Sequence, residues 1–532
     1  MRPFTRRRLL QLAASGAAWW GTGCTEPAPS RVPADGSAVT PTNMDTAASG
    51  NGEAQTKSLR IALFTLPTTL DPALFEIIEA YPFGFAVYDG LVWVDEQLVP
   101  QPMLAESWEA APDQRSWSFK LRPDVTFHHG SPLRAQDVVF TVERLLNPEL
   151  GSVLQPVLSF IDLVEAVDDH TVRFQLKAPN ADLPLLLAAP QTRILASDYP
   201  VEQLLTQPSG TGPFRFVEQI AGSHIAYVRN ADYWDAAQIQ LDELVHLQLA
   251  SFDEQVNALV QGQVDLILDV PIQHIDALNE HPETTVVETK SGRYQNLAMR
   301  VIEPPFDDVR VRQALKACLD NGVLQQKILQ ERGEVGYNHP LASISPLFVA
   351  QPAQPADPTQ ARQWLEEAGH ADGLQLQLIT ADVAPGMVDL AYAVQAMAQD
   401  AGITIEVIEV KVSSDIYFSQ YWGRVPFYVS AWEFRPSAYE TFAVAYQSES
   451  PWNETGWSSP DLDDLLAQAG SNADPAKRQE LYHQATELLA KDGAVVIPYF
   501  QPTIVAQRNH VQGFRPHPAG WVDLRGVTIA GS

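Results

Sequence analysis

The amino-acid sequence predicts an α/β protein, because short apolar runs typical of strands alternate along it with amphipathic segments typical of helices. The alternation is clear where a strand-like run at 244–249 precedes a helical segment at 252–260, which a second apolar run, VDLILDV, follows. A chain of 532 residues is also long enough for two or three domains with a large core. Together these observations predict α/β lobes.

Composition and charge restrict the function classes. Hydrophobic residues make up 45% of the chain and charged residues 19%, which is typical of a globular protein. The formal net charge of −30 disfavours nucleic acid and anionic membranes as partners of the folded body, and suits a soluble protein in an external or periplasmic space. Cys24 and Cys318 are too few for a disulfide framework, and no CxxC or HExxH pattern predicts a zinc site. We therefore expect no metal and no cofactor.

The first 23 residues are typical of an export signal. Arg2 and Arg6 to Arg8 precede the apolar run Leu9 to Trp20, which is short for a permanent membrane helix. TRRRLL resembles the twin-arginine signal, and GTGC resembles a lipobox in which Cys24 would be lipidated, although Gly21 replaces the usual leucine. An ordinary signal peptide cut nearby is the alternative, and the choice between twin-arginine and Sec export stays open.

Residues 24–58 are predicted to form a disordered tether. They are rich in Pro, Ser, Thr, Ala and Gly and almost lack large apolar residues. About 30 such residues reach on the order of 30 Å, so the folded body could stand away from a membrane to which Cys24 anchors it.

The folded sequence is predicted to begin at Leu59. Its first half should contain, in order, a strand at 59–64, a helix at 77–91, hairpin-like strands up to Phe127, a helix at 135–146, strands at 214–217, 225–229 and 244–249, a helix at 252–260 and a strand at 264–270.

The second half follows the same alternation. It should contain a strand at 293–300, helices at 309–330 and 357–369, a strand at 374–380, a helix at 387–401, strands at 403–410 and 425–431, a helix capped at Ser459-Pro460, a helix at 476–492 and a strand at 494–500.

The stretch YWGRVPFYVSAWEFRPSAY, residues 421–439, stands out in that half. An apolar run at 425–431 breaks into Trp432, Glu433, Phe434 and Arg435 before Pro436 ends the regular element. A strand that delivers aromatic and charged groups into a loop is how α/β folds place side chains that contact ligands. The alternative is a buried strand followed by an ordinary polar loop.

Four motifs in this order resemble one family. They are LAESWE, WSFKLRPDVTFHHGSPLRAQDVVFTVER, GTGPFRFVEQ at 210–219 and PFDDVRVRQALKACLD at 305–320. Each motif is weak alone, but their order and spacing resemble the family 5 extracellular solute-binding proteins, the peptide- and nickel-binding components of bacterial ABC importers. The similarity extends from about Leu59 to Val527.

The resemblance implies a two-lobed periplasmic-binding-protein fold of type II, in its large peptide-binding class, with an extra subdomain in the first lobe. The divisions expected from it are lobe I at 59–92, 210–297 and 498–532, the extra subdomain at 93–209 and lobe II at 298–497, with crossings between lobes at 293–300 and 494–500. Such a protein is a monomer that traps a peptide or similar-sized organic solute by hinge closure and delivers it to a membrane permease.

The loop after the 425–431 run would then face the interlobe cleft. Arg435 could pair with a ligand carboxylate or phosphate, and Trp432 and Tyr439 could stack on an apolar or planar part. Glu433 or Glu440 could hold an amine. Dipeptide-binding members commonly carry an acid in this loop that meets the peptide amine, and residues 434–438 here lack it. An anionic ligand group is therefore favoured over a free α-amine.

Two residues of the first crossing strand complete the predicted site. Tyr294 and Asn296 could hydrogen-bond the ligand backbone. The structural alternatives are local: Trp432 could be a core residue, and Arg435 could pair with Glu433 or another surface acid.

An enzyme is disfavoured by the motifs. No G-x-S-x-G elbow is present, and the twelve histidines show no triad or metal spacing. His128 and His129 are adjacent on an extended segment, so their side chains point to opposite faces. A hydrolytic carboxylate pair among the 65 acids stays open as an alternative, as do a nickel- or metal-chelate receptor and a sensor or chaperone of the same fold.

Overall fold

A mixed sheet of eleven strands forms the frame of the computed structural model, which describes residues 56–352 and 355–530. Its order is β15-β14-β16-β12-β17-β11-β1-β10-β9-β8, and β13 pairs with β17 beside this path. The bounds are β1 Ser58–Leu63, β8 Phe214–Ile220, β9 His224–Arg229, β10 Glu243–Gln248, β11 Leu266–Ile267, β12 Thr284–Met299, β13 Glu334–Val335, β14 Leu374–Thr380, β15 Ile403–Glu409, β16 Phe427–Trp432 and β17 Val495–Arg508.

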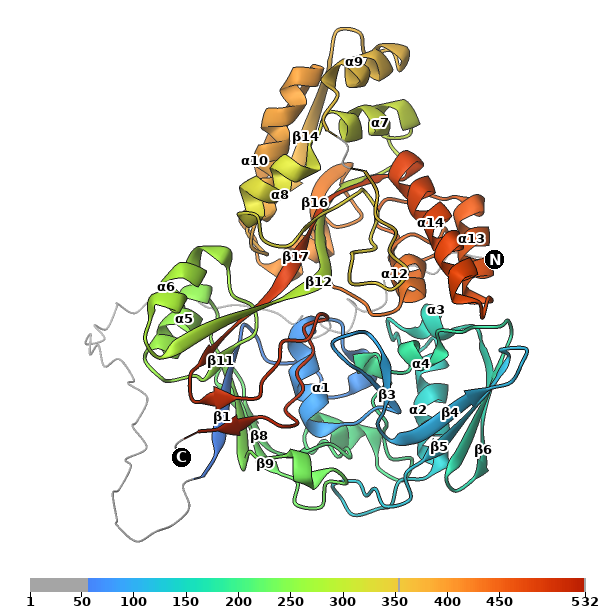
Figure 1. Cartoon of the computed structure of the whole chain (residues 1–532), viewed down its shortest axis with the longest axis vertical. Helices are drawn as coiled ribbons and strands as arrows, with labels where there is room; N and C mark the ends of the chain where they lie inside the picture. Colours follow the sequence, from blue (N-terminus) through green and yellow to red (C-terminus); the bar gives the residue numbers. More distant parts are fainter. Residues whose placement is uncertain (1–55, 353–354, 531–532) are drawn as a thin grey trace, which may run out of the picture. The chain divides into compact units, whose positions relative to one another are not determined.

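The two long strands β12 and β17 connect the two halves of this sheet. They pair antiparallel from Thr284↔Arg508 to Ala298↔Val495 and run side by side in Figure 1. In lobe I, β17 also pairs with β11, and in lobe II, β12 also pairs with β16. The β12–β17 register shifts between Thr289 and Arg293, and such irregularities bend a strand. The lobes are therefore joined by two strands that are irregular near their midpoint.

Lobe I packs short helices against its strands. They are α1 Tyr81–Val87, α5 Phe252–Val260 and α6 Ile275–Glu280, with a short terminal pair β18 Val511–Gln512 and β19 Thr528–Ile529. β1 pairs in parallel with both β10 and β11.

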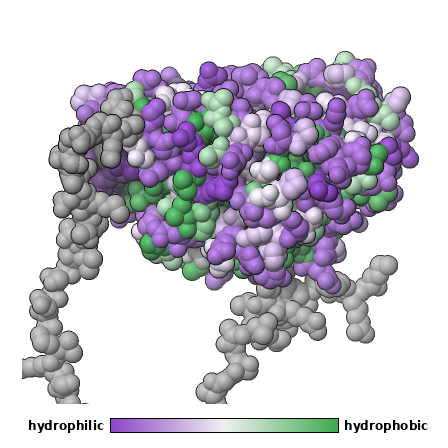
Figure 2. Space-filling view, turned by 90° about the horizontal axis from the view of Figure 1, so that it is seen from below, coloured by the Kyte–Doolittle hydropathy of each residue, from purple (hydrophilic) through white to green (hydrophobic). Residues whose placement is uncertain are grey.

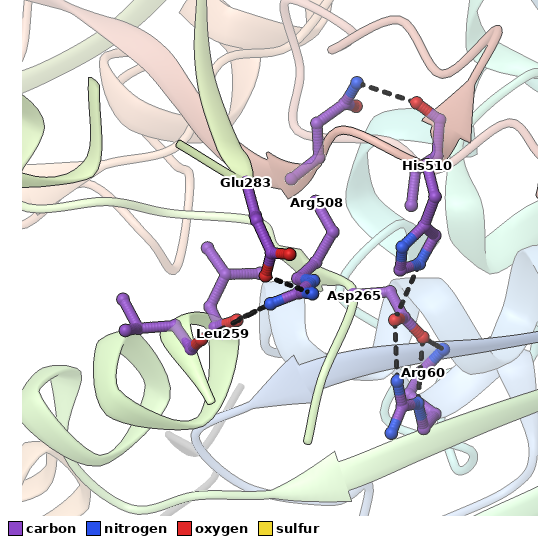
Figure 3. Close-up of polar contacts among 9 residues, drawn as sticks. Arg60, Leu259, Asp265, Glu283, Arg508 and His510 are labelled. Carbon is purple, nitrogen blue, oxygen red and sulfur yellow. Dashed lines mark hydrogen bonds and ion pairs between the residues drawn. The ribbon is translucent and has the colours of Figure 1, made fainter. Parts of the chain in front are cut away.

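A buried carboxylate, Asp265, bonds to side chains from different segments of lobe I, as Figure 3 shows. Asp265, which is 1% exposed, accepts hydrogen bonds from the Arg60 side chain at 2.9 and 2.7 Å and lies 3.0 Å from Nε2 of His510. Beside it, the Arg508 guanidinium pairs with Glu283 at 2.7 Å and donates to the carbonyl of Leu259 at the end of α5. These contacts tie the first strand of the fold to the returning strand β17.

The extra subdomain is a separate antiparallel sheet of order β4-β5-β7-β6. Its elements are β4 Ala105–Ala110, β5 Ser116–Leu121, α2 Ala135–Leu146, α3 Gln155–Leu158, β6 Ile161–Asp168, β7 Thr171–Leu176 and α4 Leu183–Leu186, preceded by the pair β2 Val92–Val94 and β3 Pro100–Pro102. Most of its buried apolar residues belong to one hydrophobic cluster with those of lobe II, whereas Leu195 and Leu204 pack into the cluster of lobe I.

Lobe II surrounds the other end of the large sheet with helices (Figure 1). They are α7 Val309–Ala317, α8 Asn321–Leu329, α9 Pro358–Glu367, α10 Met387–Ala398, α11 Ser414–Gln420, α12 Ala438–Ala445, α13 Pro460–Gly470 and α14 Pro475–Asp492.

Most predicted elements are present, and the helices at 135–146 and 252–260 have the expected bounds. The predicted helix at 77–91 is wrong in extent, because only Tyr81–Val87 is α-helical. Pro82 lies in its first turn, where a residue without an amide hydrogen begins a helix and does not continue one. The predicted helix at 309–330 is divided, because the Asp320 side chain caps a second helix by accepting from the Val323 amide at 3.0 Å.

Three further expectations need correction. The strand expected at 264–270 is paired only over Leu266–Ile267. The loop after Pro436 leads directly into α12, which was not expected. β1 begins at Ser58, the last residue of the predicted tether.

The export signal, Cys24 and residues 24–55 of the tether lie outside the residues that the structure describes. Within the described residues, no helix is long and apolar enough to cross a membrane. The face drawn in Figure 2 is mainly hydrophilic, with apolar residues in small separate groups.

Candidate functional site

The loop from strand β16 to helix α12 places the predicted ligand-binding side chains of lobe II. β16 ends at Trp432, and Ser437 caps α12 by accepting from the Glu440 amide at 3.2 Å. Because β16 fixes one end of this short segment, and Pro436 with the Ser437 cap fixes the other, Glu433 and Arg435 have defined positions between a strand and a helix.

Arg435 is the centre of the contacts in this loop. Its Nε lies 3.4 Å from Oε1 of Glu440, and its Nη1 donates to the Glu433 carbonyl at 3.2 Å. The guanidinium also lies 5.4 Å from the ring centroid of Trp432, within the range of a cation–π contact. Glu440 is buried; burial raises the pKa of its carboxyl, and Arg435 opposes that rise. The positive charge of the Arg435 guanidinium therefore partly compensates the negative charge of the buried Glu440 carboxylate.

Lobe I and the crossing strand β12 also carry charged residues. Arg293, on β12, makes a bidentate pair with Asp269, at 3.0 Å and 3.3 Å between nitrogen and oxygen. Asp269 follows β11, so this pair joins the crossing strand to lobe I. Burial raises the pKa of Glu79, and the negative charges of Glu433 and Asp269 raise it further. The charge of Glu433 in the lobe II loop therefore acts on the carboxyl of Glu79 in lobe I.

Glu440 has an arginine as its ion-pair partner, whereas no arginine or lysine side chain is bonded to Glu433 among the described residues. Oε2 of Glu433 is buried and has no hydrogen-bond partner among the described residues. Burial raises the pKa of its carboxyl, while Arg293 and Arg435 act in the opposite direction. An acceptor with a free lone pair is available here for a donor from outside the chain.

Tyr81 adds an aromatic group from lobe I. Burial raises the pKa of its hydroxyl, and the positive charge of Arg435 opposes that rise. Gln191 donates to the same hydroxyl at 3.4 Å. The charge of Arg435 therefore acts on a tyrosine of lobe I as well as on the acids of lobe II.

Tyr294, Asn296 and Trp432 are buried and lie on one face of β12 and β16. Tyr294 is directly opposite Trp432, and Asn296 is opposite Ser430. The Tyr294 hydroxyl is 2.7 Å from that of Tyr446. Asn296 Nδ2 and Trp432 Nε1 both donate to Oε1 of Glu454, at 3.0 and 2.8 Å. The hydroxyl of Tyr294, Nδ2 of Asn296 and Nε1 of Trp432 are thus engaged within lobe II, whereas Oδ1 of Asn296 is buried without a hydrogen-bond partner among the described residues.

Tyr439 lies apart from these three residues and faces the extra subdomain. Its ring makes an edge-to-face contact with Phe160, with 6.1 Å between centroids. Nearby, the Ala181 amide donates to the Gly470 carbonyl at 3.1 Å, and Arg478 pairs with Asp182 at 2.5 Å. The extra subdomain therefore contacts lobe II beside the loop.

Sequence reasoning missed Glu79, Asp269, Arg293 and Glu454. Glu454 stands in the motif PWNETGW, where a lone acid between an asparagine and a threonine gave no sign of burial. Asp269 and Arg293 meet only through the pairing of strands that are distant in sequence, so no local pattern marks them.

No group of three or more His, Cys, Asp or Glu residues is arranged to hold a metal ion in the described part of the chain. The adjacent histidines have different surroundings: His128 Nε2 is 2.9 Å from the Gly212 carbonyl, and His129 Nδ1 is 2.7 Å from the Ser209 hydroxyl.

Comparisons with known proteins agree with this architecture. Residues 99–454 match the model of the bacterial extracellular solute-binding proteins, family 5 middle region. A glutathione-binding protein of Pectobacterium atrosepticum is 26% identical over 480 residues, which cover 87% of this chain and 92% of that protein.

Solved structures show the same fold. The ABC-transporter-associated periplasmic binding protein DppA of Helicobacter pylori, in complex with the peptide STSA, has a TM-score of 0.79 at 22% identity, covering 89% of this chain and 98% of that one. NikA of Staphylococcus aureus in complex with Ni(L-His)2 has a TM-score of 0.77 at 20% identity, covering 89% of this chain and 100% of that one. At these identities the likeness shows the fold alone.

Proposed function

The chain belongs to the family 5 bacterial extracellular solute-binding proteins, and we propose that it is the receptor of an ABC importer for a peptide or a similar-sized organic solute. The solute would bind between lobe I and lobe II and be delivered to a membrane permease. The observation that carries this proposal is that charged groups of both lobes act on one another beside the two crossing strands, where Arg293 of β12 pairs with Asp269. Relatives named for glutathione and for di- or tripeptides support a peptide-like ligand.

The site supports recognition of a small polar ligand. Arg435, Glu433 and Glu440 come from lobe II, and Glu79 and Arg293 come from lobe I or its crossing strand. A peptide has donors and acceptors along its length, so it can contact both sets at once. Because a ligand shifts a two-state equilibrium only through its preference for one state, contacts to both lobes would favour closure.

Residue roles follow from this arrangement. Glu433, with its unpartnered Oε2, would accept a hydrogen bond from the ligand, and Arg435 would donate one. Trp432 would form the wall behind Arg435, and Tyr439 would bound the site towards the extra subdomain. Tyr294 and Asn296 would support the crossing strand beside the ligand.

We also propose that the protein acts outside the cytoplasm as a lipid-anchored monomer without enzymatic activity. The basic and apolar start of the chain and Cys24 in a lipobox-like sequence support export and lipidation. Mass spectrometry of the protein from a bacterial membrane fraction tests the anchor: a diacylated N-terminal Cys24 is expected, and an unmodified N-terminus elsewhere would contradict it.

Native mass spectrometry and thermal denaturation test ligand binding. The purified protein is mixed with di-, tri- and tetrapeptide libraries, with glutathione and, for comparison, with a nickel–histidine complex. A peptide that binds, at a free concentration of 100 times its Kd, should raise the free energy of unfolding by about 2.7 kcal/mol. Retention of the nickel complex with no peptide would replace the peptide assignment, and no retained solute of any kind would refute the receptor function.

A further inference from the structure

Glu454 is a buried acid whose three hydrogen-bonding side chains are all neutral. It lies between α12 and α13 and is 4% exposed. Oε1 accepts from Asn296 Nδ2 at 3.0 Å and from Trp432 Nε1 at 2.8 Å, and Oε2 accepts from the Tyr428 hydroxyl at 3.0 Å. No ion pair of Glu454 is found among the described residues.

Fold stability alone does not account for this arrangement. Burying a carboxyl group among neutral partners costs free energy, and burial indeed raises the pKa of Glu454, against the effect of its donors. Apolar side chains of similar volume often replace buried charged groups without loss of stability. The contacts of the acid indicate instead a role in placing its neighbours.

The carboxylate joins two strands and fixes one ring. Asn296 is on β12, and Tyr428 and Trp432 are on β16, all on the same face of the sheet. The indole has a single hydrogen-bond donor, so anchoring Nε1 selects one orientation of the Trp432 ring. The same oxygen also holds Asn296, which ties that orientation to the crossing strand.

The orientation of Trp432 affects the main cation of the loop. The Arg435 guanidinium lies over this ring, 5.4 Å from its centroid. It also contacts the Glu440 carboxylate and the backbone carbonyl of Glu433. A ring turned away from this position would remove one of the surfaces that define where the guanidinium lies. Glu454 thus acts on Arg435 through the indole, without contacting the guanidinium itself.

We propose that Glu454 is a positioning residue of the ligand site, which fixes the Trp432 ring and thereby sets where Arg435 meets the ligand. The inference rests on the proposed function for its effect on binding, but its structural part is independent of any ligand.

Glutamine and alanine variants separate positioning from charge. In Glu454→Gln, the amide oxygen can still accept from Asn296 and Trp432, and its NH2 can donate to the Tyr428 oxygen. Glu454→Ala removes all three contacts. The matched control is Glu449→Gln, an exposed acid of the same loop.

Fluorine NMR of protein labelled with 5-fluorotryptophan measures the ring directly. The Trp432 resonance is assigned by its absence in Trp432→Phe. We expect it to keep its position in Glu454→Gln and Glu449→Gln, and to shift or broaden in Glu454→Ala. An unchanged Trp432 resonance in Glu454→Ala would overturn the proposal.

Binding of the peptide Ala-Ala-Ala, measured by calorimetry, tests the second step. We expect at least tenfold weaker binding in Glu454→Ala and binding within threefold of the wild type in Glu454→Gln. Equal losses in both variants would overturn a positioning role. If Glu454→Ala does not fold, Trp432→Phe replaces it, since it keeps a ring without the anchoring N–H; wild-type affinity there would also overturn the proposal.

The two arms also distinguish the inference from the function on which it rests. A wild-type protein that binds no Ala-Ala-Ala counts against this peptide as ligand, whereas the fluorine resonance decides the ring's dependence on Glu454 in either case.

Discussion

Substitution of Arg478 by glutamine is expected to weaken ligand binding, although Arg478 lies outside the charged loop. Its guanidinium pairs with Asp182 of the extra subdomain at 2.5 Å, across the boundary between that subdomain and lobe II. The Asp182 side chain is 3% exposed and that of Arg478 is 14% exposed. Under the proposed hinge closure, the pair forms only while the subdomain and lobe II are in contact, so it should stabilise the closed form alone.

The size of the effect follows from the burial of the pair. Removing one partner of a buried ion pair costs about 3–5 kcal/mol, because the other charge is left without compensation. Opening the lobes lets water reach Asp182, so we expect a value near the lower limit, about 3 kcal/mol against the closed form. Since 1.4 kcal/mol is a factor of ten, the closed form should lose about 100-fold in population relative to the open form.

Calorimetry and small-angle scattering measure this change. If only the closed form holds the ligand, the apparent Kd rises by the same factor, and the radius of gyration with ligand moves towards that of the open protein. Lys477→Gln is the matched control, because Lys477 pairs with Glu480 on the same helix in an exposed position, where such pairs contribute about 0–1 kcal/mol. Wild-type affinity in Arg478→Gln, or an equal loss in Lys477→Gln, would refute the reasoning.

Four further predictions follow from individual residues. Asp265→Asn, which weakens the bonds to Arg60 and His510, should lower the free energy of unfolding by about 2 kcal/mol in urea titrations, and no change would contradict its role in joining the strands. Burial lowers the pKa of His246 to about 3, and because a free imidazole titrates near 6.5, unfolding takes up a proton between these values. His246 should therefore reduce stability by about 1.4 kcal/mol per pH unit as the pH falls below 6.5, and His246→Gln should flatten the stability profile there. Arg435→Ala should weaken peptide binding by roughly 1.5–3 kcal/mol, whereas Arg424→Ala, an exposed arginine ahead of the same strand, should not. The Cys318 thiol is buried and its pKa is raised to about 12, so peptide mapping should find it alkylated by iodoacetamide at pH 8 only after denaturation.

Local chemistry explains which elements the sequence predicts well. Helix α5 begins where Ser251 accepts from the Glu254 amide, and α14 begins where Asp474 precedes Pro475; both signals are short-range and visible in the sequence. The start of α12 had the same kind of signal, since Ser437 stands three residues before Glu440. Pro436 was interpreted as the end of a regular element, which concealed the beginning of the next one.

The contacts of the site depend on tertiary structure and could not be predicted in this way. Arg293 and Asp269 meet because β12 returns beside β17, which in turn pairs with β11. Glu454 reaches Asn296 and Trp432 only after the loop following α12 folds back over β12 and β16. The prediction that Trp432 and Arg435 belong together was possible because they are neighbours in one loop.

The pairing of Arg435 bears on which ligand group the site prefers. Sequence reasoning favoured an anionic group, because the loop has an arginine where related proteins have an acid. In the structure Arg435 already lies 3.4 Å from Glu440, and Arg293 is paired with Asp269. An anion would have to share these guanidinium groups with carboxylates that are already in place, whereas Oε2 of Glu433 has no partner among the described residues. A ligand that offers a donor to Glu433 and an acceptor to Arg435 satisfies both groups, and the two ends of a short peptide backbone carry such groups at once.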